Sequence, residues 1–433
     1  MTEQSSPLER SLTLTVSLAG VDADVAKRLK QLSKTARIDG FRPGKVPASM
    51  LRNMYGDQVM RDALSDAAQN TFQNAVREQS LRVVGTPMFE SVESAPESGQ
   101  YAFKATFEVF PEVVPGDISN AAIERPLVTV TDADVDRTID ILRKQRTRWV
   151  SVARDAAAGD RVLMDFKGFK DDVPFEGGTG EKQHCVLGSG QYLADFENAL
   201  LGAKAGDTRN FDMTFPADYQ APGLAGQTVR FEVFVHDVQM PVLPELDAEF
   251  AQSLGIESGD TALMRAEIQG NLEREAKKRI QGRLKDQVMK ALVEATELAV
   301  PKALIGFEIQ RLRQNAAQDW KARTGQDMNG MQLPDSLFEE QAKRRVSVGL
   351  VLSELVQREK LEAAPEQVRA LLVEQAESYE QPDEMVRWYY EDPERLREVE
   401  SVVLEDNVVT WALSRAKVSD KPIAFQDLIG GAA

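Results

Sequence analysis

The chain has 433 residues, 42% of them hydrophobic and 28% charged, a balance typical of a soluble globular protein with about two to four domains. Its formal net charge of −17 argues against general nucleic-acid binding, because an anionic surface repels phosphate. The sequence begins without a basic or apolar leader and has no apolar run near the ~18 residues of a membrane span. We therefore expect a cytoplasmic protein that makes no contact with membranes.

Cysteine and histidine are scarce in this sequence. The single cysteine, Cys185, rules out an internal disulfide and fits a reducing compartment. His184 beside it does not predict a catalytic cysteine–histidine pair, because neighbours on a strand point to opposite faces. His236 is the only other histidine, and no CxxC or HExxH spacing occurs. We expect neither a transition-metal site nor any other cofactor.

Residues 1–111 predict an α+β unit. Alternating apolar residues indicate strands, and apolar residues three and four positions apart indicate helices. We expect, in chain order, a strand at 12–18, a basic helix at 21–37, a helix at about 48–79, and strands at 81–89 and 101–110. Pro111 and Pro115 then end the unit, because proline interrupts regular strand pairing.

The predicted helix at 21–37 has two faces of different character. Its apolar face carries Val21, Val25, Leu29, Leu32 and Ala36, and its cationic face carries Lys27, Lys30, Lys34 and Arg37. Residues 27–52 together hold eight cations and one anion, inside an otherwise anionic chain. This local concentration of positive charge predicts a site for a polyanion such as RNA. The alternative is a face that is merely solvated.

The segment after this helix reads Gly40-Phe41-Arg42-Pro43-Gly44-Lys45-Val46-Pro47. Glycine adopts positive φ and proline fixes φ, so the run predicts a rigid turning loop rather than a helix or strand. Such a loop would present Phe41 and Arg42 at an exposed tip, as a docking device. The alternative is an ordinary connection whose phenylalanine packs into the core.

Residues 112–150 predict a connector, and residues 151–244 predict a glycine-rich β unit. The connector ends in a helix from Thr131 or Asp132 to about Trp149. The β unit has strand patterns at 162–169, 211–215 and 229–238, and a glycine-rich turn enters a short helix within 188–202. That turn could cradle phosphate, but no Lys-Ser/Thr pair follows it and no Rossmann pattern surrounds it. Nucleotide binding is therefore disfavoured.

Residues 245–433 predict a mostly α-helical unit. The expected helices cover about 260–297, 302–323, 335–361, 365–379, 383–391 and 394–416. Prolines at 301, 334, 365, 382 and 393 precede amphipathic runs, where proline is favoured at the first helical position. Most apolar residues on these helices are expected to lie in the interior. The pattern does not show which of them are exposed.

The segment from Gly40 to Pro47 resembles the signature loop of bacterial trigger factors, chaperones that dock beside the ribosomal exit tunnel. The order of the later segments is similar to that family along essentially the whole chain. The resemblance implies that Gly40, Phe41, Arg42, Pro43, Gly44 and Lys45 contact a protein of the large ribosomal subunit and nearby rRNA. Pro43 stands where some members have lysine, which removes one cation and stiffens the tip. The family also implies that 112–150 packs with the C-terminal domain and that homodimers form away from the ribosome.

The 151–244 segment resembles the FK506-binding-protein fold, an antiparallel sheet wrapped on one short helix. The shared skeleton includes Asp165-Phe166-x-Gly168, Phe175-Glu176-Gly177, Gln191-Tyr192-Leu193-x-x-Phe196-Glu197, Phe215-Pro216-x-x-Tyr219 and Phe231-Glu232-Val233. The resemblance implies a prolyl isomerase pocket lined by Phe166, Phe175, Tyr192, Leu193, Phe196, Tyr219 and Phe231. In that pocket Phe196 is the floor, Leu193 supplies a backbone N–H, and Glu176 and Tyr219 make polar contacts at the rim. The alternative is that these aromatic residues only form the core of a small β domain.

Prolyl isomerisation requires neither a nucleophile nor a metal. Resonance makes the C–N bond before proline partly double, so rotation about it has a barrier of roughly 20 kcal/mol. A dry aromatic pocket favours the twisted amide over the planar, more dipolar one, and a backbone N–H holds the substrate carbonyl. Because Phe196 replaces the tryptophan floor of typical members, we expect modest activity.

The expected fold is therefore multidomain α+β. It comprises an N-terminal α+β ribosome-docking domain (1–111), a connector (112–150), an FK506-binding-protein-like β domain with one short helix (151–244) and a mostly α-helical chaperone domain (245–433). The primary hypothesis is an ATP-independent chaperone that docks at the ribosomal exit tunnel, shields nascent and unfolded polypeptides, and isomerises X–Pro bonds. One alternative is a free prolyl isomerase whose helical domain recruits substrates without ribosome docking. Another is an interaction scaffold with an inactive β domain.

Overall fold

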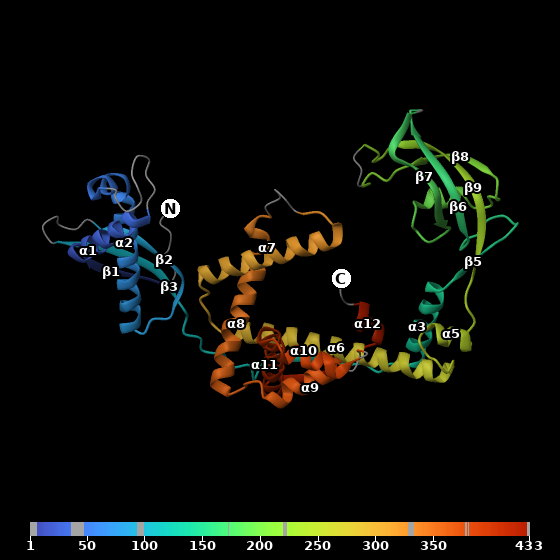
Figure 1. The fold of residues 1–433 in the computed structure, drawn as a ribbon. Helices are drawn as coiled ribbons and strands as arrows, with labels where there is room; N and C mark the ends of the chain where they lie inside the picture. The colour runs from blue at the N-terminus through green and yellow to red at the C-terminus, as the bar shows by residue number, and fades with distance from the viewer. Residues whose placement is uncertain are drawn as a thin grey trace. The chain divides into compact units, whose positions relative to one another are not determined.

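The computed structural model describes residues 7–35, 47–92, 99–171, 173–219, 223–327, 333–376, 379 and 381–430 (Figure 1). The chain divides into two compact units. One comprises Met1–Arg125 and Gln281–Lys421, and the other comprises Pro126–Ile280 and Pro422–Ala433. None of the helices in the described ranges combines the length and the apolar character that a membrane crossing requires.

The first α+β unit has a three-stranded antiparallel sheet and two helices, as the sequence predicts. Its elements are β1 (Glu9–Ser17), α1 (Leu18–Thr35), α2 (Ala48–Glu78), β2 (Val83–Val92) and β3 (Gln100–Val109), and β3 lies between the other two strands. Phe103, Ala105 and Phe107 are buried on one face of β3, because side chains two apart on a strand share a face. The ring of Phe72, on α2, meets Phe107 edge-on at a centroid distance of 5.0 Å.

The central β unit is a five-stranded antiparallel sheet that packs on one short helix. Its elements are β5 (Arg148–Ser151), β6 (Arg161–Lys170), β7 (Val173–Val186), α4 (Ala194–Ala199), β8 (Thr208–Thr214) and β9 (Thr228–Val242). The strand order is β5-β9-β6-β7, and β8 pairs with β9 (Figure 1). The buried face of β9, formed by Val229, Phe231, Val233 and Val235, shares one core with Phe196 of α4.

The helix of the connector is shorter than the sequence predicts. α3 (Asp132–Gln145) ends before Trp149, which instead lies in β5 and pairs with Pro241 of β9. The guanidinium of Arg161 lies over the Trp149 ring at 4.7 Å, so the aromatic residue is fixed on the sheet. The predicted start is confirmed, because Thr131 and Asp134 form a reciprocal capping box at the beginning of α3.

Helices dominate the rest of the chain. They are α5 (Ala248–Ser253), α6 (Thr261–Ala295), α7 (Lys302–Thr324), α8 (Glu339–Glu359), α9 (Pro365–Ala376), α10 (Pro382–Tyr390), α11 (Pro393–Arg415) and α12 (Phe425–Gly430), with a short 3₁₀ turn (η2, Asp335–Leu337) before α8. Three of them, α9, α10 and α11, begin at a proline, which confirms the prediction that proline marks helix starts in this region. A two-stranded pair of β4 (Ala122–Leu127) and β10 (Lys417–Pro422) was not predicted, because its strands are separated by most of the C-terminal sequence.

Replacing Phe72 by alanine tests whether the first α+β unit has a core of its own. Loss of a buried phenylalanine ring costs about 3–5 kcal/mol, so amide exchange in β3 should accelerate roughly a hundredfold or more. Amides of β9, which belong to a different core, should exchange at the rate of the unsubstituted protein. Hydrogen exchange with mass spectrometry on the full chain measures both strands. Equal acceleration in β3 and β9, or none in β3, would contradict separate cores.

Candidate functional site

The predicted docking loop, Gly40–Lys45, lies outside the described residues and stays a prediction. The basic helix before it is described as α1 over Leu18–Thr35. α1 buries Val21 and leaves Lys27, Lys30 and Lys34 exposed, as the two-faced pattern predicts. Three lysines of the cationic face are therefore available to an anionic partner.

Arg28 differs from the other cations of α1. Its Nε donates to Asp24 and its Nη2 donates to Asp66, both at 2.6 Å. Asp66 belongs to α2, so Arg28 ties the two helices together. Its charge is already balanced by two carboxylates and adds little to the cationic face.

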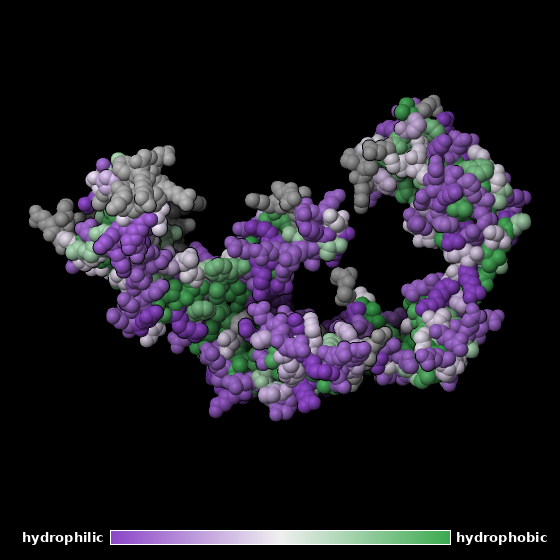
Figure 2. All heavy atoms as spheres, viewed as in Figure 1, coloured by the Kyte–Doolittle hydropathy of each residue, from purple (hydrophilic) through white to green (hydrophobic). Residues whose placement is uncertain are grey.

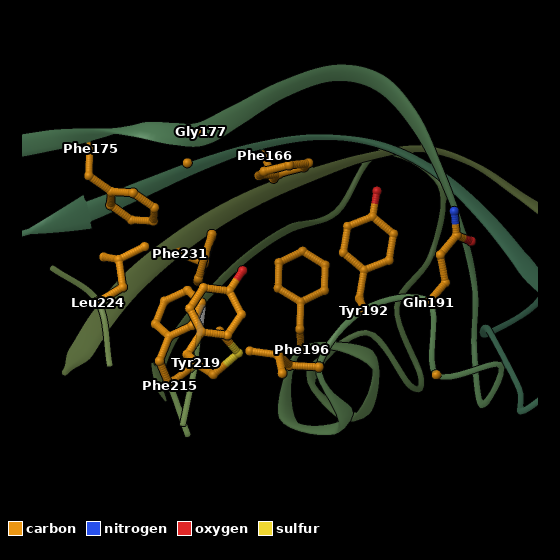
Figure 3. A pocket seen from close by; sticks show the side chains of 14 residues that line it. Phe166, Phe175, Gly177, Gln191, Tyr192, Phe196, Phe215, Tyr219, Leu224 and Phe231 are labelled. Atoms are coloured by element: carbon orange, nitrogen blue, oxygen red, sulfur yellow. The ribbon is translucent and has the colours of Figure 1, made fainter. Parts of the chain in front are cut away.

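A pocket with a volume of about 450 Å³ opens in the central β unit (Figure 3). It is lined by Phe166, Phe175, Gly177, Gly178, Gly190, Gln191, Tyr192, Leu193, Phe196, Met213, Phe215, Tyr219, Leu224 and Phe231. All seven residues predicted to line the pocket are among them. The eighth predicted site residue, Glu176, has its backbone in β7, and its side chain lies outside the described set. Residues from β6, β7, β8, β9 and the turn before α4 thus converge on one cavity.

Phe196 lies at the centre of the aromatic cluster. Its ring is 3% exposed and stacks on Tyr192 at a centroid distance of 5.2 Å. It meets Phe231 edge-on at 5.2 Å and Phe166 edge-on at 5.9 Å. Such edge contacts add to the stability gained from burial alone. Phe196 therefore has the central, buried place that the family resemblance implies for a pocket floor.

Glycines on the strands make room for these rings. A Cβ atom on Gly168 would lie 2.5 Å from Cε1 of Phe175, and one on Gly180 would lie 2.5 Å from Cε1 of Phe166. Distances below 3.0 Å are not tolerated between such atoms, so any larger residue would displace the rings. The glycines that the sequence places on β6 and β7 therefore help to set the width of the pocket.

Sequence reasoning did not select several of the lining residues. Met213 in β8 and Phe215 just after the strand are buried on alternate positions, and the Phe215 ring lies 4.6 Å from that of Tyr219. Their alternation within 211–215 is the signal that could have identified them. Leu224 and Gln191 come from irregular segments, where no periodic pattern marks a residue as pocket-lining.

A buried carboxylate lies behind the turn that leads to α4. Glu197 is 4% exposed, and it accepts hydrogen bonds from the N–H groups of Gly188 (2.8 Å), Gly190 (3.3 Å) and Tyr192 (3.1 Å). Burial alone would raise the pKa of this carboxyl, but the surrounding backbone donors hold its pKa below the ordinary value. By contrast, the N–H of Leu193 has no hydrogen-bond acceptor within the described parts of the chain.

Cys185 is a structural thiol. Its side chain is 0% exposed, whereas His184 beside it is exposed on the other face of β7, so the two do not form a catalytic pair, as expected. Burial, and then the negative charge of Glu197, raise the pKa of the thiol to about 12. The described residues contain no cluster of three or more histidine, cysteine, aspartate or glutamate side chains that could hold a metal ion.

An antiparallel sheet wrapped on one short helix around an aromatic pocket defines a prolyl isomerase domain of the FK506-binding-protein class. The family model for FKBP-type peptidyl-prolyl cis-trans isomerases matches residues 152–236. Models described as bacterial trigger factor protein and its C-terminus match residues 1–142 and 261–414. The chain belongs to the bacterial trigger factor family.

Curated relatives cover nearly the whole chain. The trigger factor of Dechloromonas aromatica is 51% identical over 99% of this chain and 98% of its own length. Those of Aromatoleum aromaticum and Chromobacterium violaceum are each 48% identical over 100% of this chain and 99% of their own. The protein is therefore a ribosome-associated cytoplasmic chaperone with an FKBP-type prolyl isomerase domain, and its partners are the ribosome and nascent chains. This confirms the primary hypothesis over a free isomerase and over an inactive scaffold.

The burial of Cys185 predicts a thiol that is inert in the native protein. Because only the thiolate attacks a disulfide, a pKa of about 12 should slow reaction with Ellman's reagent at pH 8 roughly a thousandfold relative to the unfolded chain. Absorbance at the wavelength of the released thiolate follows both reactions, and Cys185→Ser supplies the blank. Equal rates in the native and the denaturant-unfolded protein would refute the buried position.

Proposed function

We propose that the pocket is the prolyl isomerase site and that Phe166, Phe175, Glu176, Tyr192, Leu193, Phe196, Tyr219 and Phe231 carry its activity. One observation carries the proposal. Seven aromatic side chains from distant parts of the sequence surround a single cavity, and beside them Leu193 has an N–H without an acceptor within the described residues. An ordinary β-domain core would be filled by its own side chains and would have no need of a free donor.

The proposed reaction uses desolvation and one hydrogen bond. A proline ring enters the cavity and rests on the ring of Phe196, which excludes water from the preceding amide. Loss of solvation favours the twisted amide, because its dipole is smaller than that of the planar form. The Leu193 N–H donates to the substrate carbonyl and holds it while the bond rotates. Tyr219, which is 39% exposed, and Glu176 form the polar rim.

We further propose that residues 40–45 dock on the large ribosomal subunit near the exit tunnel, where they contact protein and rRNA. Support comes from the helix that leads to them, since Lys27, Lys30 and Lys34 are exposed on one face of α1. Such a positively charged face attracts phosphate groups, whereas the chain as a whole has a net negative charge that repels them. Pro43 should stiffen the tip at the cost of one cation.

The remaining domains receive the roles that the family implies. We propose boundaries at 1–111, 112–150, 151–244 and 245–433, with the last region shielding nascent chains without ATP and the protein dimerising away from the ribosome. Apolar side chains gather where α7 and α8 adjoin (Figure 2). A hollow of about 350 Å³ there is lined by Leu304, Phe307, Val346 and Leu350 among others, and Phe307 is 56% exposed. Exposed apolar surface of this kind suits weak contacts with unfolded segments.

The pocket assignment predicts that Phe196→Ala and Phe231→Tyr lower prolyl isomerase activity. Alanine removes the floor and tyrosine places a hydroxyl among apolar rings, so we expect the rate of a proline-limited refolding reaction to fall about tenfold or more. The matched control is Phe234→Ala, because Phe234 is on the same strand but points to the opposite face and is 40% exposed. Normal activity in both pocket variants would remove the assignment.

The docking proposal is tested by sedimentation of ribosomes with the Phe41→Ala/Arg42→Ala double variant. Without the aromatic tip and its cation, the protein should remain in the supernatant at moderate salt, since binding to phosphate depends on charge. The control is Met88→Ala/Lys104→Ala, which removes one exposed apolar residue and one exposed cation elsewhere in the first α+β unit. If the tip variant pellets with ribosomes as well as the control does, docking uses another surface.

A further inference from the structure

We propose that Glu197 is a positioning residue for isomerisation: its buried carboxylate fixes the turn at 188–192 so that the next N–H, that of Leu193, is presented to the substrate. Glu197 does not itself line the pocket. The inference rests on the pocket function proposed above and deepens it, because it names what holds the hydrogen-bond donor in place.

Both carboxylate oxygens of Glu197 accept hydrogen bonds from backbone N–H groups of the turn. Oε2 accepts from Gly188 N–H at 2.8 Å and from Gly190 N–H at 3.3 Å, and Oε1 accepts from Tyr192 N–H at 3.1 Å. Three donors within five residues therefore point inward at one carboxylate. A peptide segment pinned at three points cannot rotate its next amide freely, so the N–H of Leu193 has a defined direction.

The turn requires a backbone that only glycine adopts readily. Gly188 has φ +88° and Gly190 has φ +73°, both in the left-handed region. A Cβ atom on either glycine would meet nothing within 4 Å, so the need for glycine comes from the backbone conformation and not from lack of space. This conformation is the one that directs successive N–H groups toward the carboxylate.

Leu193 is held from both sides. The residue before it donates its N–H to Glu197, and its own carbonyl accepts from the N–H groups of Phe196 (2.9 Å) and Glu197 (3.1 Å) in the first turn of α4. Glu197 thus takes part in both anchors, through its side chain and through its backbone. Between these anchors only the Leu193 N–H stays free within the described residues, and Leu193 lines the pocket.

The carboxylate must be charged to hold this arrangement, because a protonated or amide group offers fewer acceptors to three donors. No cation among the described residues contributes to the pKa shift of Glu197. Cys185 on β7 and Tyr192 on the turn both have raised pKa values, chiefly through burial, and stay neutral. Backbone N–H groups alone therefore stabilise the charge, which couples the ionised state directly to the shape of the turn.

A second buried carboxylate in the same domain provides a matched control. Asp160 is 2% exposed and accepts from Arg154, with Nη1 to Oδ2 at 2.5 Å, and from the N–H of Ala157. Within the described parts of the chain, its carboxylate bonds only to Arg154 and Ala157, neither of which belongs to the turn at 188–192 or to the pocket lining. A general loss of stability should follow from Asp160→Asn as much as from Glu197→Gln, whereas only Glu197→Gln should disturb the donor.

The experiment measures kcat and KM for an X–Pro tetrapeptide by exchange NMR, using the full chain at temperatures well below each variant's unfolding midpoint. Glu197→Gln should lower kcat about tenfold and change KM less than about twofold, because a misplaced donor weakens the twisted state and the aromatic pocket still binds proline. Asp160→Asn should keep the kcat of the unsubstituted protein. Unchanged kcat in Glu197→Gln, or an equal loss in Asp160→Asn, would overturn the proposal.

A second variant tests the positioning role of the turn if Glu197→Gln does not fold. Gly188→Ala keeps the carboxylate but strains the left-handed backbone, and Gly188 does not line the pocket. It should show the same fall in kcat with KM preserved, and normal kcat would refute the positioning role. Phe196→Ala distinguishes failure of the pocket function from failure of the positioning role. If Phe196→Ala keeps full isomerase activity, the pocket is not the isomerase site. If Phe196→Ala is inactive but the turn variants keep full activity, the pocket is the site and Glu197 does not position its donor.

Discussion

A prolyl isomerase pocket has to combine dry aromatic walls with one available hydrogen-bond donor, and these demands conflict. Backbone N–H groups next to apolar rings cost free energy when they have no partner. In this protein a single buried carboxylate, Glu197, accepts from three such groups in the turn before α4, whereas the N–H of the next residue, Leu193, has no acceptor within the described residues. The rest of the site is built around this arrangement, since the same helix carries Phe196 to the centre of the rings.

The fold supplies what the turn alone cannot. Antiparallel pairing of β6 with both β7 and β9 brings Phe166, Phe175 and Phe231 together, although the last is far from the others in sequence. Glycines on β6 and β7 let the rings lie against the backbone. The first α+β unit and the helices after residue 245 have separate cores, so ribosome association, shielding and isomerisation can be carried by different parts of one chain.

Much of the fold and of the pocket could be predicted from the sequence. Alternating apolar residues predicted β3 and β9, and prolines predicted several helix starts. The order of short motifs predicted the family and the aromatic residues of the pocket. Glu197 was missed as a functional residue because its partners are backbone N–H groups, whose direction no side-chain pattern reveals. The end of α3 was misplaced because Trp149 pairs with a distant strand, and the pairing of β4 with β10 depends on long-range contacts. The docking loop falls outside the described residues, so its prediction is still open.

The most direct measurement is an NMR titration of the isotopically labelled protein with an X–Pro tetrapeptide. We expect the largest amide shift at Leu193 and cross-relaxation between the proline ring protons and the ring of Phe196. Shifts concentrated on the outer face of β9, around Phe234, with the Leu193 amide unmoved, would contradict it.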